Sequence, residues 1–117
     1  MWFYNVTGGS IENNLVIDFG SSLSHYVVSE GGSTGITIDY NGVWKTDADA
    51  PLGGPYPHDV WMQDPLLVDL GGQDYRLTAG SPMVDTGDHL DATVPDDYDG
   101  RLRHLGVGYD IGAYECY

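Results

Sequence analysis

Two six-residue stretches decide how this chain is expected to fold: ENNLVI at Glu12–Ile17 and DYNGVW at Asp39–Trp44. They lie 27 residues apart, and each has an acidic residue two places before an asparagine, Asn14 or Asn41, with apolar residues two and three places after it. An offset within about 20–50 residues is typical of solenoid repeats, where stacked asparagines can form a hydrogen-bonded ladder. Asparagine also marks ordinary turns beside strands, so these residues alone leave both interpretations open.

The sequence around these stretches consists of short apolar runs separated by turn residues. Glycine accounts for 17 of the 117 residues, whereas the good helix formers are scarce, a composition typical of strands and turns. Short strands at regular spacing indicate an all-β domain. The predicted strands are Trp2–Val6, Asn14–Ile17, Tyr26–Ser29, Ile36–Asp39 and Gly42–Trp44, and Gly8–Ser10 is predicted to be a turn.

The charge balance excludes several classes of protein. Four basic residues stand against 18 acidic ones, which gives a net charge of −14. Too few cations remain to neutralise phosphates, so we expect neither nucleic acid nor an anionic membrane surface as a partner. No apolar run is long enough to cross a bilayer, and the single cysteine, Cys116, excludes an internal disulfide framework. The first residues do not read as a signal peptide, so the sequence leaves the compartment unknown.

The second half carries longer and more specific motifs. In this order they resemble the C-terminal end of right-handed parallel β-helix proteins of the pectate-lyase-like superfamily, and the resemblance extends from Asp59 to Glu115. Leu67 departs from the family pattern, where an aromatic residue is common, and so does the stretch Arg101–Tyr109. The motifs are QDPLLVD at Gln63–Asp69, DYRLTAGSPMVDTG at Asp74–Gly87, DGR at Asp99–Arg101 and DIGAYE at Asp110–Glu115.

The resemblance implies a fold: a right-handed parallel β-helix fragment with a C-terminal capping segment. Residues 1–58 would form about two coils, and residues 59–117 would form the capping region of the same domain. Nothing would cover the first coil, which would therefore have an open edge. We expect the chain to form a homo-oligomer that buries Trp2, Phe3 and Tyr4 against another copy.

The residues of the second half also predict local roles without the resemblance. Ser81 and Pro82 suit the start of a single helical turn, and the Asp85 carboxylate is expected to accept backbone N–H groups after it. Gly80 and Gly87 are expected to take positive φ, and Asp99-Gly100 a tight turn. We expect Asp110 and Glu115 to flank a bend, with Arg101 or Arg103 as counter-ion, so these acids are interpreted as structural.

Aromatic residues supply one candidate binding site. Flat rings on a β-surface can stack on sugars, although large side chains also fill cores and interfaces. The candidate carbohydrate-binding residues are Tyr40, Trp44, Tyr56 and Trp61.

A short acidic run supplies a candidate metal site. Asp96, Asp97 and Asp99 precede Gly100 and resemble half of a calcium loop. The distal glutamate that completes such a loop is missing, so solvated turn acids are the alternative interpretation. Calcium is the one cofactor for which the sequence offers ligands, and otherwise none is expected.

No complete catalytic constellation occurs, and no catalytic residue is assigned. Lys45 and Arg76 are the only basic residues before Gly100, and neither lies in a lyase motif. The sequence therefore favours a small non-catalytic module that is carbohydrate-associated or self-assembling, with a polysaccharide as the expected ligand. The alternatives are the separated C-terminal tail of a polysaccharide lyase or glycoside hydrolase, and a calcium-stiffened, adhesin-like surface module. The resembling proteins are often secreted or attached to the cell surface.

Overall fold

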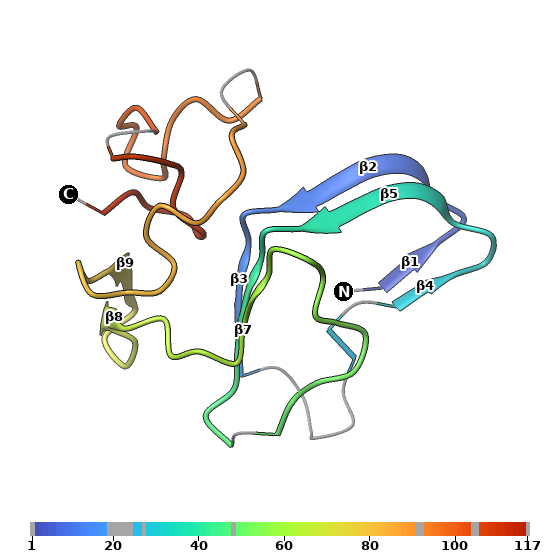
Figure 1. The fold of residues 1–117 in the computed structure, drawn as a ribbon, viewed down its shortest axis with the longest axis horizontal. Helices are drawn as coiled ribbons and strands as arrows, with labels where there is room; N and C mark the ends of the chain where they lie inside the picture. Colours follow the sequence, from blue (N-terminus) through green and yellow to red (C-terminus); the bar gives the residue numbers. More distant parts are fainter. Residues whose placement is uncertain are drawn as a thin grey trace.

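The fold is built from short strands joined by long turns. The computed structural model describes residues 2–18, 25–26, 28–47, 49–90, 93–103 and 106–116. Within these residues there are no helices, and hence none that could cross a membrane, and the strands form four small sheets (Figure 1). The strands are β1 (Trp2–Tyr4), β2 (Thr7–Glu12), β3 (Leu15–Ile17), β4 (Val28–Glu30), β5 (Thr34–Asp39), β6 (Gly42–Trp44), β7 (Val60–Trp61), β8 (Leu67–Asp69) and β9 (Asp74–Leu77).

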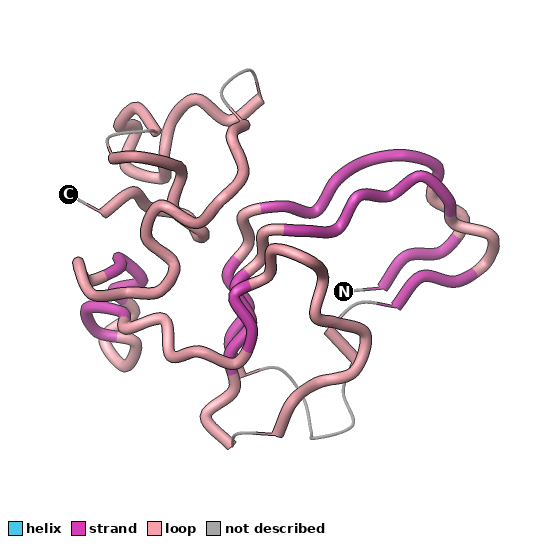
Figure 2. Tube along the Cα trace, in the orientation of Figure 1, coloured by secondary structure: helices cyan, strands magenta, loops and turns pink. Residues whose placement is uncertain are grey.

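Two consecutive passes of the chain lie side by side in the first half. The first pass, residues 2–17, holds β1, β2 and β3, and the second pass, residues 28–44, holds β4, β5 and β6. Each strand of the first pass pairs in parallel with the corresponding strand of the second, as Thr7 with Thr34 and Leu15 with Gly42. The 27-residue spacing predicted from the two asparagine motifs is thus the register of β2–β5 and β3–β6. Figure 2 shows the two passes following the same bent course.

A polar ladder at the corner between β2 and β3 joins the two passes to β7. The backbone N–H of Asn14 donates to Oδ1 of Asn41 at 3.0 Å, and the N–H of Asn41 donates to Oδ1 of Asp59 at 2.9 Å. Nδ2 of Asn41 donates to the carbonyls of Ile11 and Asp39, and Asn41 is fully buried. Its amide can be buried without a desolvation penalty because both its donors and its acceptor are hydrogen-bonded. We call Asn14, Asn41 and Asp59 the amide ladder.

The apolar side chains gather in two clusters on either side of β6. One contains Tyr26 and Val43, and the other contains Val60, Leu77, Met83 and Ile111. Gly42 lies where the second cluster meets β6. A Cβ at Gly42 would lie 2.7 Å from Sδ of Met83 and 2.9 Å from Cδ1 of Leu15. The absence of a side chain at this position therefore allows the C-terminal half to pack directly on the paired strands.

The second half is held by carboxylates that accept backbone N–H groups. Oδ1 of Asp85 accepts from Val107 and Gly108, both at 2.8 Å. Oδ1 of Asp110 accepts from Asp85 at 2.7 Å, and Oε1 of Glu115 accepts from Asp110 at 3.2 Å. These contacts confirm the structural role predicted for the acids. Arg103 is the counter-ion of Glu115, at 3.3 Å.

Asn13 docks the second half onto the first. It turns the chain between β2 and β3 with a φ of 58°, a conformation that asparagine adopts more readily than most residues. Its Oδ1 accepts the N–H of Asp88 and its Nδ2 donates to the carbonyl of Asp88, both at 2.7 Å. Its own carbonyl accepts the N–H of Gly112 at 2.9 Å. One nearly buried residue thus ties two distant C-terminal segments to the corner of the first pass.

The predicted right-handed parallel β-helix fragment with a C-terminal capping segment is wrong. The strands lie in separate sheets of two or three, and β8 and β9 pair antiparallel as a hairpin. Beyond β7 the described chain does not continue the parallel pattern, since β8 and β9 pair only with each other and the bridges Gly87–Tyr109 and Asp96–Leu102 are antiparallel. A solenoid needs about three or more repeating units, and only two passes repeat here. The chain is a small all-β domain with mixed sheets, and its division at residue 58 stays a prediction.

Two local predictions also fail. Gly8–Ser10 was predicted to be a turn but lies within β2, because pairing with β5 holds this glycine-rich segment in the sheet. Gly80 and Gly87 do not take positive φ, and Asp85 does so instead, with a φ of 56°. The carboxylate of Asp85 bonds to Val107 and Gly108, which compensates for the local backbone strain at that residue.

The amide ladder makes a direct prediction about stability. We expect Asn41→Ala to lower the free energy of unfolding by about 3 kcal/mol, because it leaves buried backbone groups without partners. Asn14→Ala is the matched control, since Asn14 is exposed, and should cost about 1 kcal/mol or less. Urea denaturation followed by tryptophan fluorescence measures both, and equal losses in the two variants would contradict the central place given to Asn41.

Candidate functional site

Two of the four predicted carbohydrate-binding residues belong to the core. The rings of Tyr56 and Trp61 meet the buried ring of Tyr26 edge to face, with centroids 6.3 Å and 5.7 Å apart. Both side chains pack against the cluster of Tyr26 and Val43. Their shape and burial are explained by packing, which was the alternative interpretation of the aromatic residues.

The other two predicted carbohydrate-binding residues, Tyr40 and Trp44, do not form an open aromatic surface. Tyr40 stacks on the imidazole of His58, with centroids 4.4 Å apart and an angle of 10° between the planes. Nδ1 of His58 lies 2.7 Å from Oδ2 of Asp39. Desolvation raises the pKa of Asp39, but hydrogen bonds from His58 and Tyr40 outweigh it and the net pKa is lowered. Trp44 is half-buried at the end of β6, in register with Ile17.

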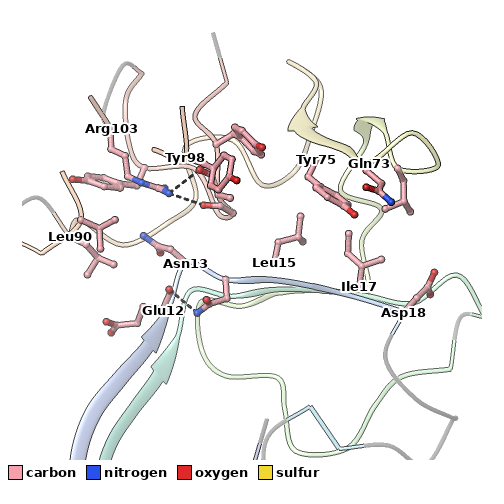
Figure 3. Close-up of a pocket in the computed structure, with 17 residues that line it drawn as sticks. Glu12, Asn13, Leu15, Ile17, Asp18, Gln73, Tyr75, Leu90, Tyr98 and Arg103 are labelled. Atoms are coloured by element: carbon pink, nitrogen blue, oxygen red, sulfur yellow. Dashed lines mark hydrogen bonds between the residues drawn. The ribbon is translucent and has the colours of Figure 1, made fainter. Parts of the chain in front are cut away.

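The structure places an open groove elsewhere, between β3 and the C-terminal half (Figure 3). Its volume is about 1080 Å³, at the upper end of the range for small-molecule sites. Leu15 and Ile17 rise from β3 as its floor, and Tyr75 and Gln73 descend toward them from the β8–β9 hairpin. The groove is lined by Glu12, Asn13, Asn14, Leu15, Ile17, Asp18, Leu70, Gln73, Tyr75, Leu90, Val94, Tyr98, Arg103, Tyr109, Gly112, Ala113 and Tyr114.

Four tyrosines line the groove, and three of them give it its aromatic surface, because the fourth, Tyr109, is buried. Tyr75 is 47% exposed and Tyr98 is 77% exposed, so both rings are open to a ligand. Tyr114 meets Tyr98 edge to face, with centroids 5.4 Å apart. Desolvation and the nearby carboxylate of Asp99 raise the pKa of Tyr114. A tyrosine hydroxyl is protonated at neutral pH even without this shift, so it can donate a hydrogen bond to a ligand.

The charged groups that line the groove are largely committed to the protein itself. Arg103 donates to the carbonyls of Asp96, Gly112 and Ala113, and its side chain is only 8% exposed. Oδ1 of Asp18 accepts both the N–H and the hydroxyl of Thr46, at 2.7 Å and 2.9 Å. Glu12 contributes a second carboxylate. The groove thus offers aromatic faces, amides and hydroxyls, with negative charge at its rim.

The candidate calcium ligands are not gathered around a common point. Both carboxylate oxygens of Asp97 are occupied, since they accept the N–H groups of Asp99, Arg101 and Glu115. The part of the chain that the structure describes contains no group of three or more histidine, cysteine or acidic side chains that could hold a metal ion. Gly100, with a φ of 74°, completes the tight turn predicted at this position.

The residues predicted at the oligomer interface, Trp2, Phe3 and Tyr4, lie on two opposite faces of β1. Trp2 and Tyr4 project outward from β1 and are 69% and 67% exposed, whereas Phe3 packs against the cluster of Tyr26 and Val43. Alternate side chains of a strand point to opposite sides, so only two of the three residues are open to a partner.

The chain matches no family model, no curated protein and no solved structure. The resemblance to the pectate-lyase-like superfamily therefore stays a prediction that rests on the quoted motifs, and the fold that it implied is not the one observed.

The sequence carries no pattern that marks the tyrosines of the groove as site residues. Tyr75, Tyr98 and Tyr114 all lie in the second half, among turn residues, and no spacing links them to Leu15 and Ile17 of the first pass. The docking through Asn13 and the packing of Leu15 against the cluster of Val60, Leu77, Met83 and Ile111 bring these segments together. The second half holds five of the nine tyrosines, which is about its share of the chain, so the composition gave no signal.

The hydrogen bonds that the Asp97 carboxylate accepts yield a prediction that also tests the calcium hypothesis. Asp97→Ala should lower the free energy of unfolding by about 2–3 kcal/mol, because three backbone N–H groups, one of them buried, lose their acceptor. Asp96→Ala, at an exposed neighbour, should change it by about 0.5 kcal/mol or less. Millimolar calcium should leave the melting temperature of the unmodified chain unchanged, and a rise in melting temperature that Asp97→Ala abolishes would restore the metal site.

Proposed function

We propose that this chain is a small non-catalytic module that binds a neutral oligosaccharide in the groove between β3 and the C-terminal half. The observation that carries the proposal is the pair of open rings, Tyr75 and Tyr98, on the walls of a groove of about 1080 Å³. Sugar rings present C–H groups to aromatic faces and hydroxyls to amides, and the groove offers both kinds of surface.

The polar residues of the groove suit the recognition of hydroxyl groups. Gln73 is an exposed amide, and its side chain can both donate to and accept from a sugar hydroxyl. The Tyr114 hydroxyl adds a further group that can donate a hydrogen bond. Pockets with a mainly apolar lining and a few polar groups that fix orientation are typical of binding sites for small ligands.

The charges favour a neutral sugar over a polyuronate. Glu12 and Asp18 are the acidic groups that line the groove, and the guanidinium of Arg103 is held by carbonyls and Glu115. No free cation therefore faces the ligand among the described lining residues. A chain with a net charge of −14 also repels a polyanion at low and moderate ionic strength.

The same arrangement supports binding without cleavage. Glycoside hydrolysis requires two carboxyl groups that flank the bond, one of them free to protonate the leaving group. Asp18 is already an acceptor for Thr46, which leaves Glu12 as the remaining carboxylate of the lining. A lyase acting on polyuronates would need a cation beside the substrate, and Arg103 is committed elsewhere.

Binding can be tested with soluble hexasaccharides of glucose, xylose and mannose, with a galacturonate hexasaccharide as the anionic comparison. We expect one neutral hexasaccharide to shift backbone amide resonances around Gln73, Tyr98 and Tyr114, and the galacturonate to shift none. Tyr75→Ala and Tyr98→Ala should each weaken binding about tenfold, the equivalent of about 1.4 kcal/mol for one lost stacking contact.

Tyr40→Ala is the matched control, because Tyr40 stacks on His58 outside the groove and its loss should leave affinity unchanged. Weakened binding in Tyr40→Ala with none in the two groove variants would move the site back to the residues predicted from sequence. Cleavage of the galacturonate, seen as new reducing ends, would instead support the lyase-tail alternative and contradict the proposal.

A further inference from the structure

The first pass presents one continuous strand edge. β1, β2 and β3 each lie at the edge of their own sheet, and each pairs only with the second pass or with strands beyond it. Along residues 2–17, alternate N–H and C=O groups on the outer side therefore have no strand partner in the described part of the chain. Exposed edges of this kind are templates for pairing with another strand.

The amide ladder ends at this edge with an open acceptor. In the ladder, each side-chain oxygen accepts the backbone N–H of the preceding member, as Asn41 does for Asn14 and Asp59 does for Asn41. Nδ2 of Asn14 donates to Oδ1 of Asn41 and to the carbonyl of Glu12. Oδ1 of Asn14 accepts no hydrogen bond from any described residue. The first member of the ladder, Asn14, thus keeps one side-chain acceptor that no described residue uses.

The edge is also open to the close approach of a backbone. Gly8 and Gly9 lie in β2, and a Cβ built at either would meet nothing within 4 Å. Glycine within a strand often marks a place where another backbone comes near. Trp2 and Tyr4 of β1, which precedes this segment, are large exposed rings, and tryptophan and tyrosine are among the residue types that dominate the energy of interfaces.

The charge of this edge indicates that its partner is a second copy of the chain. Residues 2–17 contain one acidic residue, Glu12, and no basic residue, although the whole chain has 18 acidic residues and a net charge of −14. Two copies of such a chain repel each other over most of their surface. The first pass is the region where they can meet with the least repulsion, whereas a basic partner would gain more from any other face.

We propose that the edge of the first pass is the contact surface of a homodimer, in which two copies pair through the same edge. The second pass does not offer the same edge along its whole length, because β7 covers β6, although β4 and β5 lie at the edges of their two-stranded sheets. A head-to-tail stack of β2 on β5 would form open filaments, whereas two-fold pairing of identical edges gives a closed dimer. The two-fold axis sets β2 antiparallel to β2 of the second copy, with Trp2 and Tyr4 at the sides.

Sedimentation equilibrium over micromolar to sub-millimolar concentrations tests the proposal. We expect a concentration-dependent shift from the monomer mass of 12.7 kDa to twice that mass. Ser10→Glu places a like charge on each copy in the middle of β2, where directly opposed charges destabilise an antiparallel pair, and should leave only monomer. Val107→Glu adds the same charge at a residue that is 87% exposed in the C-terminal half and should leave the dimer intact.

Hydrogen exchange on the unmodified chain gives a second readout that needs no variant. Protection of backbone amides within residues 2–17 should rise with protein concentration, and protection at the hairpin of β8 and β9 should not. A monomer at all concentrations would overturn the proposal. A dimer that Ser10→Glu leaves intact would also overturn it. A dimer that Ser10→Glu and Val107→Glu dissociate equally would overturn it as well, because equal dissociation would reflect net charge alone.

Discussion

The side-chain amide of Asn41 is the interaction on which the rest of the structure depends. It is fully buried at the corner where both passes turn, and its donors and acceptor are all occupied by Asn14, Ile11 and Asp39. A buried amide that is satisfied in only one arrangement penalises every other register of the paired strands. The parallel register then places β7 beside β6 and fixes where the C-terminal half can pack.

The many aspartates of this chain act mainly as substitutes for regular backbone pairing. Backbone N–H groups from segments that form no strands donate to Asp85, Asp97 and Asp110. These hydrogen bonds hold together the C-terminal half, which contains little β-sheet. Burial raises the pKa of Asp110, and the N–H groups of Asp85 and Cys116 counteract this effect only in part. An acidic composition therefore indicates structural carboxylates here, and the groove owes its shape to them.

Local patterns in the sequence predicted local structure well and predicted the overall architecture badly. Asn14 and Asn41 predicted the 27-residue register, and the sequence also predicted that Asp85 accepts backbone N–H groups and that Arg101 or Arg103 is the counter-ion of the C-terminal acids. It did not show that the N–H groups bound by Asp85 belong to Val107 and Gly108, more than 20 residues further along the chain. The solenoid failed because the sequence does not show how few passes would repeat. The groove was missed because its walls come from segments about 60 to 100 residues apart, which meet through Asn13 and through the packing of Leu15 against the second cluster.

The most direct test of the account is a measurement of register in solution. If the amide ladder sets parallel pairing between the passes, nuclear Overhauser contacts should join backbone protons of Val16 to those of Val43, and of Val43 to those of Trp61. The side-chain amide protons of Asn41 should also exchange slowly, since both are held by carbonyls in the interior. Contacts that place residues 12–17 antiparallel to residues 39–44, or rapid exchange at the Asn41 amide, would contradict it.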